Sequence, residues 1–139
     1  MYDEAVIGLT EARKAIQAML DEAEKEPDRS VAMAVVDGQG RLVAFARMDR
    51  CRLLPQQLAY KKAYTAAIMR SDTAAVAERF KSMGRSVSDF GDPNMAAVQG
   101  GVAIQRLSDE AFLGGIGVSG LRADEDEAMA RIGVRAMGL

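Results

Sequence analysis

The chain has 139 residues, 49% hydrophobic and 27% charged, which is typical of one globular domain. Its formal net charge of −2 gives no general attraction to nucleic acid, whose binding proteins usually carry a basic surface. Cys51 is the only cysteine, so an internal disulfide is excluded. No apolar run reaches the roughly 18 residues of a membrane span, and no positively charged start is followed by an apolar run, so we expect no signal peptide. We therefore expect a single cytoplasmic domain over residues 1–139 that binds neither membranes nor nucleic acid.

Histidine is absent from the sequence. This excludes Ser-His-Asp and Cys-His catalysis, and it removes the commonest ligand of zinc and of haem iron. With a single cysteine, thiolate-rich metal sites are excluded as well. We predict no metal site built from protein side chains.

The first half of the chain predicts a helix, a hairpin and a second helix. Residues 4–24 carry apolar side chains at helical spacing, and Pro27 ends that element. Residues 31–36 and 41–48 are apolar runs joined by a glycine-rich turn, which indicates an antiparallel hairpin. Both runs look buried on both faces, so helices should cover the sheet on each side. Residues 53–70 then form a helix with a stripe of small residues.

The second half predicts a short helix, a long loop, another hairpin and a final helix. Ser71 and Asp72 can cap a helix that runs to about Phe80, and residues 83–101 form the loop. Residues 102–104 and 111–118 make the second hairpin, and residues 124–137 the last helix, whose first acids, such as Asp126, favour its start. A fifth short strand can form near residues 95–98. The fold class is α+β, with an antiparallel sheet between helices.

A glycine motif at Gly115–Gly120 matches the dinucleotide-binding pattern GxGxxG. No second strand with a ribose-binding acid can follow it, and the acids at the start of the next helix would repel a pyrophosphate. Two interpretations remain: Gly115 and Gly117 permit close packing, or they let a small ligand approach the strand.

Arg47 and Lys62 are the cationic side chains that the pattern singles out. Arg47 ends a predicted strand, and Lys62 lies among small helical residues, so both can point to one place and bind a carboxylate. The neighbouring cations Arg50, Arg52 and Lys61 are interpreted as a solvated face.

Several segments, in this order along the chain, resemble the GlcG/HbpS-like haem-binding family, which also occurs as the C-terminal domain of PduO-type corrinoid adenosyltransferases. The matching segments are Val35–Ala44, Arg47–Asp49, Lys62–Ala66, Gly100–Ile104, Gly114–Gly120 and Asp126–Glu127. The resemblance implies a profilin-like, three-layer α/β/α fold with a five-stranded antiparallel sheet, and assembly into homo-oligomers. Ala103 replaces a proline that is usual in the family, which loosens the turn into that strand.

Some members of this family bind haem, so the resemblance implies a site for haem or a similar flat anionic molecule. The candidate ligand-binding residues are Arg47, Asp49, Lys62, Thr65, Gly115, Gly117 and Ser119. Without histidine, a hydroxyl of Thr65 or Tyr64 is a possible iron ligand.

Two alternatives to a haem-binding protein stay open. The first is a cofactor-free lyase or isomerase acting on a small carboxylated, possibly aromatic, catabolite, with Lys62 or Tyr64 as acid or base. The second is an oligomeric accessory protein of a catabolic operon, without chemistry of its own.

Overall fold

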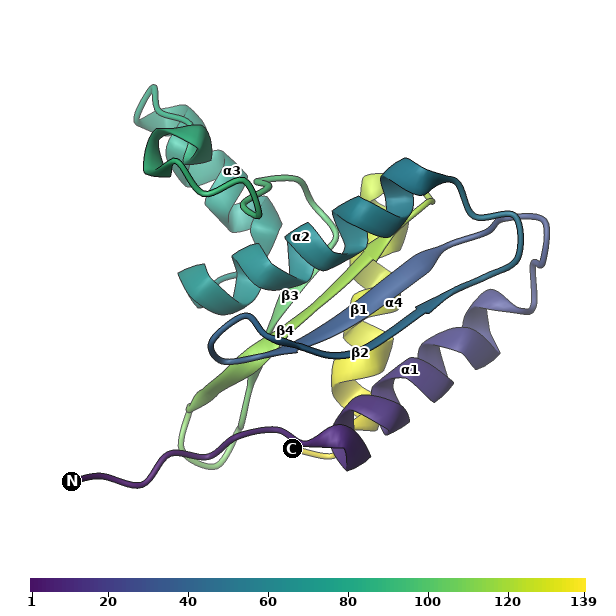
Figure 1. Cartoon of the computed structure of the whole chain (residues 1–139), viewed down its shortest axis with the longest axis horizontal. Coiled ribbons are helices and arrows are strands. Elements are labelled where there is room, and N and C mark those ends of the chain that lie inside the picture. Colours follow the sequence, from purple (N-terminus) through teal and green to yellow (C-terminus); the bar gives the residue numbers. More distant parts are fainter.

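Four antiparallel strands form the central sheet of the computed structural model, which describes all of residues 1–139 (Figure 1). The strands are β1 (Ala32–Asp37), β2 (Leu42–Arg47), β3 (Gly101–Gln105) and β4 (Phe112–Ser119). Their order across the sheet is β2-β1-β4-β3, so β2 and β3 are the two edges. The register places Ala32 of β1 opposite both Arg47 of β2 and Ser119 of β4.

Helices cover both faces of this sheet, as the sequence predicts (Figure 1). On one face lie α1 (Leu9–Ala23) and α4 (Ala123–Ala136), and on the other lies α2 (Leu53–Met69). The shorter α3 (Thr73–Ser82) and a 3₁₀ turn at Val87–Phe90 project beyond the end of α2. None of the four helices combines the length and apolar composition that a membrane-spanning helix requires.

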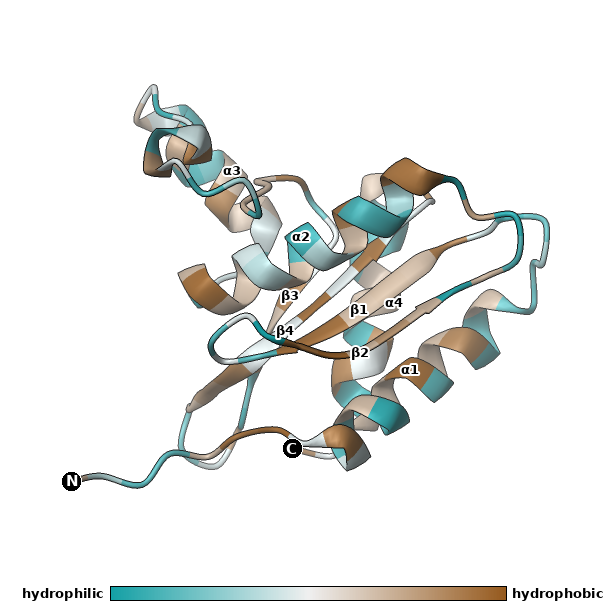
Figure 2. Cartoon of the chain, in the orientation of Figure 1, coloured by the Kyte–Doolittle hydropathy of each residue, from teal (hydrophilic) through white to brown (hydrophobic).

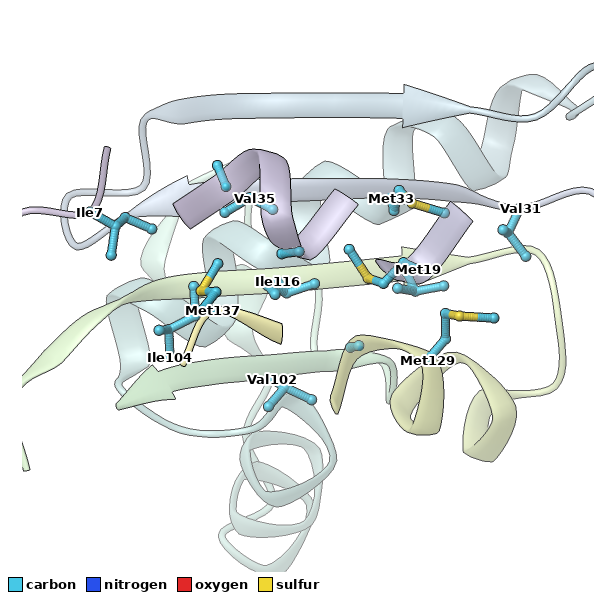
Figure 3. Close-up of a cluster of buried hydrophobic side chains, with 14 of the residues drawn as sticks. Ile7, Met19, Val31, Met33, Val35, Val102, Ile104, Ile116, Met129 and Met137 are labelled. Carbon is cyan, nitrogen blue, oxygen red and sulfur yellow. The ribbon is translucent and has the colours of Figure 1, made fainter. Parts of the chain in front are cut away.

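The main core lies between the sheet and the pair α1 and α4. Figure 3 shows Met19, Met33, Ile116 and Met129 directed toward one another in this layer. Methionine fills irregular gaps well, which suits a core where two helices and a twisted sheet meet. Figure 2 shows hydrophilic and hydrophobic residues alternating around α1, as expected of a helix that buries one side.

α2 packs unusually close to the sheet because β4 carries glycines beneath it. A Cβ atom at Gly115 would lie 2.3 Å from the carbonyl oxygen of Ala63, and one at Gly117 would lie 2.0 Å from that of Ala59. Both distances are far shorter than any contact a methyl group tolerates. The small-residue stripe of α2 and the glycines of β4 are therefore two halves of one packing arrangement.

Three details of the prediction are wrong. The sheet has four strands, not five, because residues 95–98 bond to side chains instead of to a strand: the Ala96 N–H donates to Thr65 Oγ1, and the Val98 carbonyl accepts from Thr73 Oγ1. The strand 42–47 is a half-exposed edge and is not buried on both faces. The first helix begins at Leu9, after Gly8, and not at residue 4.

Candidate ligand-binding groove

Three chain segments, residues 27–30, 50–58 and 119–121, converge at the end of the sheet where α2 begins, and they leave a groove on the surface. The first part has a volume of about 350 Å³ and an entirely polar or small-residue lining, made by Pro27, Asp28, Arg29, Ser30, Arg50, Arg52, Pro55 and Gly120. The second part has a volume of about 270 Å³ and is lined by Arg52, Leu54, Pro55, Leu58, Ser119, Gly120 and Leu121. The two parts share Arg52, Pro55 and Gly120 and so adjoin each other; together they are called the groove.

The first part of the groove is cationic. Arg50 and Arg52 are exposed, and neither side chain has a carboxylate partner. Arg29, in contrast, is held by Glu125 through a bidentate pair of 2.7 and 2.8 Å, which lowers the pKa of that carboxyl to about 2. Arg50 also adopts a left-handed backbone conformation with φ of 67°, which is uncommon for a residue with a Cβ. Two guanidinium groups are thus available to an anion.

The N-terminus of α2 adds to this positive potential. Arg52 is the N-cap residue, no side chain caps the helix, and its first turn contains no acid. The N–H groups of Leu53 and Leu54 consequently have no acceptor. Free N–H groups and the helix dipole both favour negative charge at this position.

The second part of the groove contains three leucines beside Arg52 and Ser119. Leu54, which is 62% exposed, lines this part together with Leu58 and Leu121. The first turn of α2 accordingly stands out as hydrophobic in Figure 2. A groove with cations at one end and leucines at the other matches a molecule with a carboxylate edge and an apolar body.

Two predicted residues, Arg47 and Asp49, lie at the same end of the molecule as the groove but do not line it. Arg47 is exposed at the end of β2, close enough to Cys51 to lower its pKa, although burial has the larger effect and raises the pKa of that thiol. The Asp49 carbonyl accepts a hydrogen bond from Ser30 Oγ at 2.6 Å, which ties the β2–α2 connection to the start of β1.

Ser119 lines the groove, and Lys62 lies beneath it. Ser119 is only 4% exposed at the end of β4. Lys62 is 2% exposed, and its Nζ donates to the Val118 carbonyl at 2.9 Å and to Asp126 Oδ2 at 3.1 Å. Asp126 Oδ1 in turn accepts from the Leu121 N–H at 3.0 Å. This buried pair therefore fixes the corner from Ser119 to Leu121 from inside, and Lys62 does not reach the surface beside Arg47.

The remaining predicted residues lie on α2 or on the part of β4 that α2 covers, away from the groove. Gly115 and Gly117 are covered by the α2 backbone, so a ligand could reach them only by displacing that helix. Thr65 is buried and donates to the Lys61 carbonyl while accepting from Ala96. The Tyr64 hydroxyl donates to Asp92 at 2.6 Å, and this bond raises the pKa of the tyrosine and lowers that of the aspartate.

A second hollow of about 200 Å³ lies between α1 and α4 and is lined partly by Glu22, Glu26 and Glu125. Its carboxylates disfavour an anionic ligand, so the groove at the start of α2 is the better candidate. No three acidic or cysteine side chains come together in a way that could hold a metal ion.

Sequence reasoning missed Arg50, Arg52 and Asp126. The two arginines look like any solvated basic face until the chain folds and the start of β1 and the end of β4 close around them. Asp126 could have been found: it precedes Met129 by three residues and Gly133 by seven, which places it on the inward face of α4.

Comparison with known proteins agrees with this fold. The chain is 32% identical to the protein GlcG of Escherichia coli K12 over 119 residues, 86% of this chain and 85% of the relative. A double mutant of HbpS from Streptomyces reticuli has a TM-score of 0.87 at 29% identity, covering 100% of this chain and 92% of that one. A PduOC–haem complex has a TM-score of 0.83 at 24% identity over 95% of each chain. The model of the family described as "Haem degrading protein HbpS-like" matches residues 7–135, and the chain therefore belongs to this HbpS-like family.

Proposed function

We propose that the protein binds haem, or a similar flat anionic molecule, in the groove at the N-terminus of α2. The observation that carries this proposal is that a cationic hollow with Arg50 and Arg52 adjoins a second hollow that contains Leu54 and Leu58. The family description and the haem complex of a protein with this fold support the same class of ligand.

The polar end of the groove suits carboxylates. A guanidinium binds a carboxylate through two parallel hydrogen bonds, and charged hydrogen bonds of this kind are the strong ones. The two free N–H groups of α2 offer further donors to the same anion. Haem propionates would lie here, and the ring edge would contact the leucines.

The donor set fits the periphery of haem better than its iron. Imidazole is absent from the sequence, the Cys51 thiol is buried with a raised pKa, and the hydroxyls of Thr65 and Tyr64 are engaged elsewhere. Bound haem would supply an iron centre for redox chemistry, while this chain holds the carboxylates and shields one edge of the ring. Affinity should therefore depend on the carboxylates and not on the metal.

The enzyme alternative finds less support. Lys62 and Tyr64 bond to Asp126 and to Asp92, and neither lines the groove, so they are not placed as an acid–base pair around one substrate.

Porphyrin titrations test the proposal. Hemin should give a saturable Soret change, and metal-free protoporphyrin IX should bind with similar affinity, whereas its dimethyl ester should bind much more weakly. Arg50→Ala and Arg52→Ala should each weaken hemin binding about tenfold, corresponding to the loss of one charged hydrogen bond.

Arg13→Ala is the matched control, because Arg13 is an exposed arginine on α1. No saturable Soret change, or a double variant of Arg50 and Arg52 that binds as tightly as this control, would overturn the proposed site.

A further inference from the structure

Arg29 is the third arginine of the groove, and the fold gives it a partner that the other two lack. It lies in the segment between α1 and β1, and it lines the first part of the groove together with Arg50 and Arg52. Its two terminal nitrogens donate to the carboxylate of Glu125 on α4 at 2.8 and 2.7 Å. Glu125 thus occupies the same pair of donors that a ligand carboxylate would use.

The pair between Arg29 and Glu125 is open to water, so a ligand can replace one of its members. The two side chains are 41% and 27% exposed, whereas Lys62 and Asp126 form a pair in the interior that is 2% and 3% exposed. Exposed ion pairs contribute little to stability, because water and salt compete for both charges. A ligand carboxylate held beside Arg50 would therefore compete with Glu125 on nearly equal terms.

Both members of the pair have other contacts when it opens. Glu125 also accepts from the Arg122 N–H at 3.3 Å, and its carboxylate lies 3.5 Å from Arg122 Nε. Arg29 lies 3.8 Å from a carboxylate oxygen of Glu26, which is a second and weaker partner. Because Arg29 lines the groove as well as the hollow between α1 and α4, its guanidinium need not cross the core to meet a ligand.

We propose that Arg29 binds a second acid group of the ligand, which must displace Glu125 to reach it. The first acid group binds Arg50 and Arg52, which have no carboxylate partner. Glu125 then keeps the third arginine closed to molecules with a single acid group, so the ligand of the groove is a diacid. This inference rests on the proposed function, since it concerns the same groove, and it assigns the specificity of that groove to a residue that touches no ligand.

Anchoring explains why two acid groups succeed where one does not. Once Arg50 and Arg52 hold the first group, the second is confined to a hollow of about 350 Å³ that also contains Arg29. Such confinement corresponds to an effective concentration in the millimolar range or above. A molecule with one acid group competes with Glu125 only at its bulk concentration. The two propionates of haem meet the requirement for two acid groups.

A comparison of a diacid with its monoester tests the assignment. Protoporphyrin IX and its monomethyl ester are titrated at physiological ionic strength into the wild type and into Glu125→Gln. Glutamine can still accept the Arg122 N–H, so the start of α4 is retained. The substitution should raise the affinity for the diacid about threefold, because the ligand no longer has to break an ion pair. The affinity for the monoester should stay unchanged.

Arg29→Ala separates competition for this arginine from a general change in charge. It should weaken binding of the diacid about threefold, and in its background Glu125→Gln should have no further effect. Asp124→Asn is the matched control, because it removes the same charge from the same turn of α4. Asp124 bonds to Arg122 and not to Arg29, so this control should leave the affinity for the diacid unchanged.

Three results would overturn this inference and leave the groove as a porphyrin site. They are a diacid affinity that ignores Glu125→Gln or Arg29→Ala, an equal gain for diacid and monoester, and a gain that persists in the Arg29→Ala background. If neither porphyrin binds, the proposed function fails, and the same variants are titrated with inorganic pyrophosphate, which carries two anionic groups without a ring. An affinity for pyrophosphate that Glu125→Gln raises only when Arg29 is present would support the inference. No binding, or an affinity that ignores Glu125, would overturn it.

Discussion

At the scale of single residues, Lys62 shows how burial reassigns a charge. Its amine lies in the interior with Asp126, where burial raises the pKa of the carboxyl although Lys62 acts in the opposite direction. A buried ion pair offsets its desolvation only when both partners are present. Lys62, which the sequence suggests as a ligand contact, instead stabilises the backbone beneath the groove.

Replacing Lys62 with methionine should lower the free energy of unfolding by about 3–5 kcal/mol at pH 7, because Asp126 is left charged and unpaired in the interior. The double variant Lys62→Met, Asp126→Leu should recover part of this loss. Urea denaturation of both variants measures the difference. A single variant as stable as the wild type would contradict the role of the pair.

The loss of stability in the Lys62→Met variant should depend on pH in a defined direction. A carboxyl whose pKa is higher in the folded protein than its unfolded value of 3.8 stabilises the fold when protonated, and this contribution is lost as the pH rises through the folded pKa. Removing Lys62 removes an interaction that lowers the pKa of Asp126. The cost of Lys62→Met should therefore be smaller near pH 4 than at pH 7, as urea midpoints at the two pH values would show.

At the scale of elements, the packing of α2 on β4 is a part of the fold that the sequence predicts. Glycines in β4 and alanines in α2 are visible in the sequence, and helix, strand and close packing follow from them. The missing fifth strand could not be foreseen, because the side chains that bond residues 95–98, Thr65 and Thr73, lie far away in the sequence. The groove escaped prediction for the same reason, since its lining comes from three separate segments.

Gly117→Ala should destabilise the protein by about 3 kcal/mol or more, because its methyl group would overlap the Ala59 carbonyl and force α2 away from the sheet. Gly38→Ala is the matched control: its methyl group would meet nothing closer than 3.7 Å, and its φ needs no glycine. Thermal unfolding compares the two. Equal melting temperatures would show that α2 accommodates the methyl group.

At the scale of the whole molecule, a net charge of −2 conceals a cationic end. Attraction between this end and an anion acts through water and is screened by salt, with a screening length of about 8 Å at physiological ionic strength. Composition alone cannot reveal such an arrangement, because it depends on which arginines the fold leaves without carboxylates.

A porphyrin that binds the folded state should raise the melting temperature, and added salt should reduce this shift. The comparison is made by differential scanning fluorimetry at about 50 mM and 500 mM sodium chloride, with the unliganded protein as the reference at each concentration. A shift that does not change with salt would indicate that apolar contacts alone hold the ligand.

The glycines of β4 also have a consequence for the order of folding. β4 is a central strand between β1 and β3, yet glycine favours strands poorly and leaves the unfolded segment highly mobile. We expect the local β1–β2 hairpin and α2 to organise first and to template β4 afterwards. Substitutions in β1 should then slow refolding, whereas substitutions in β4 should chiefly speed unfolding, a contrast that the two arms of a chevron plot separate.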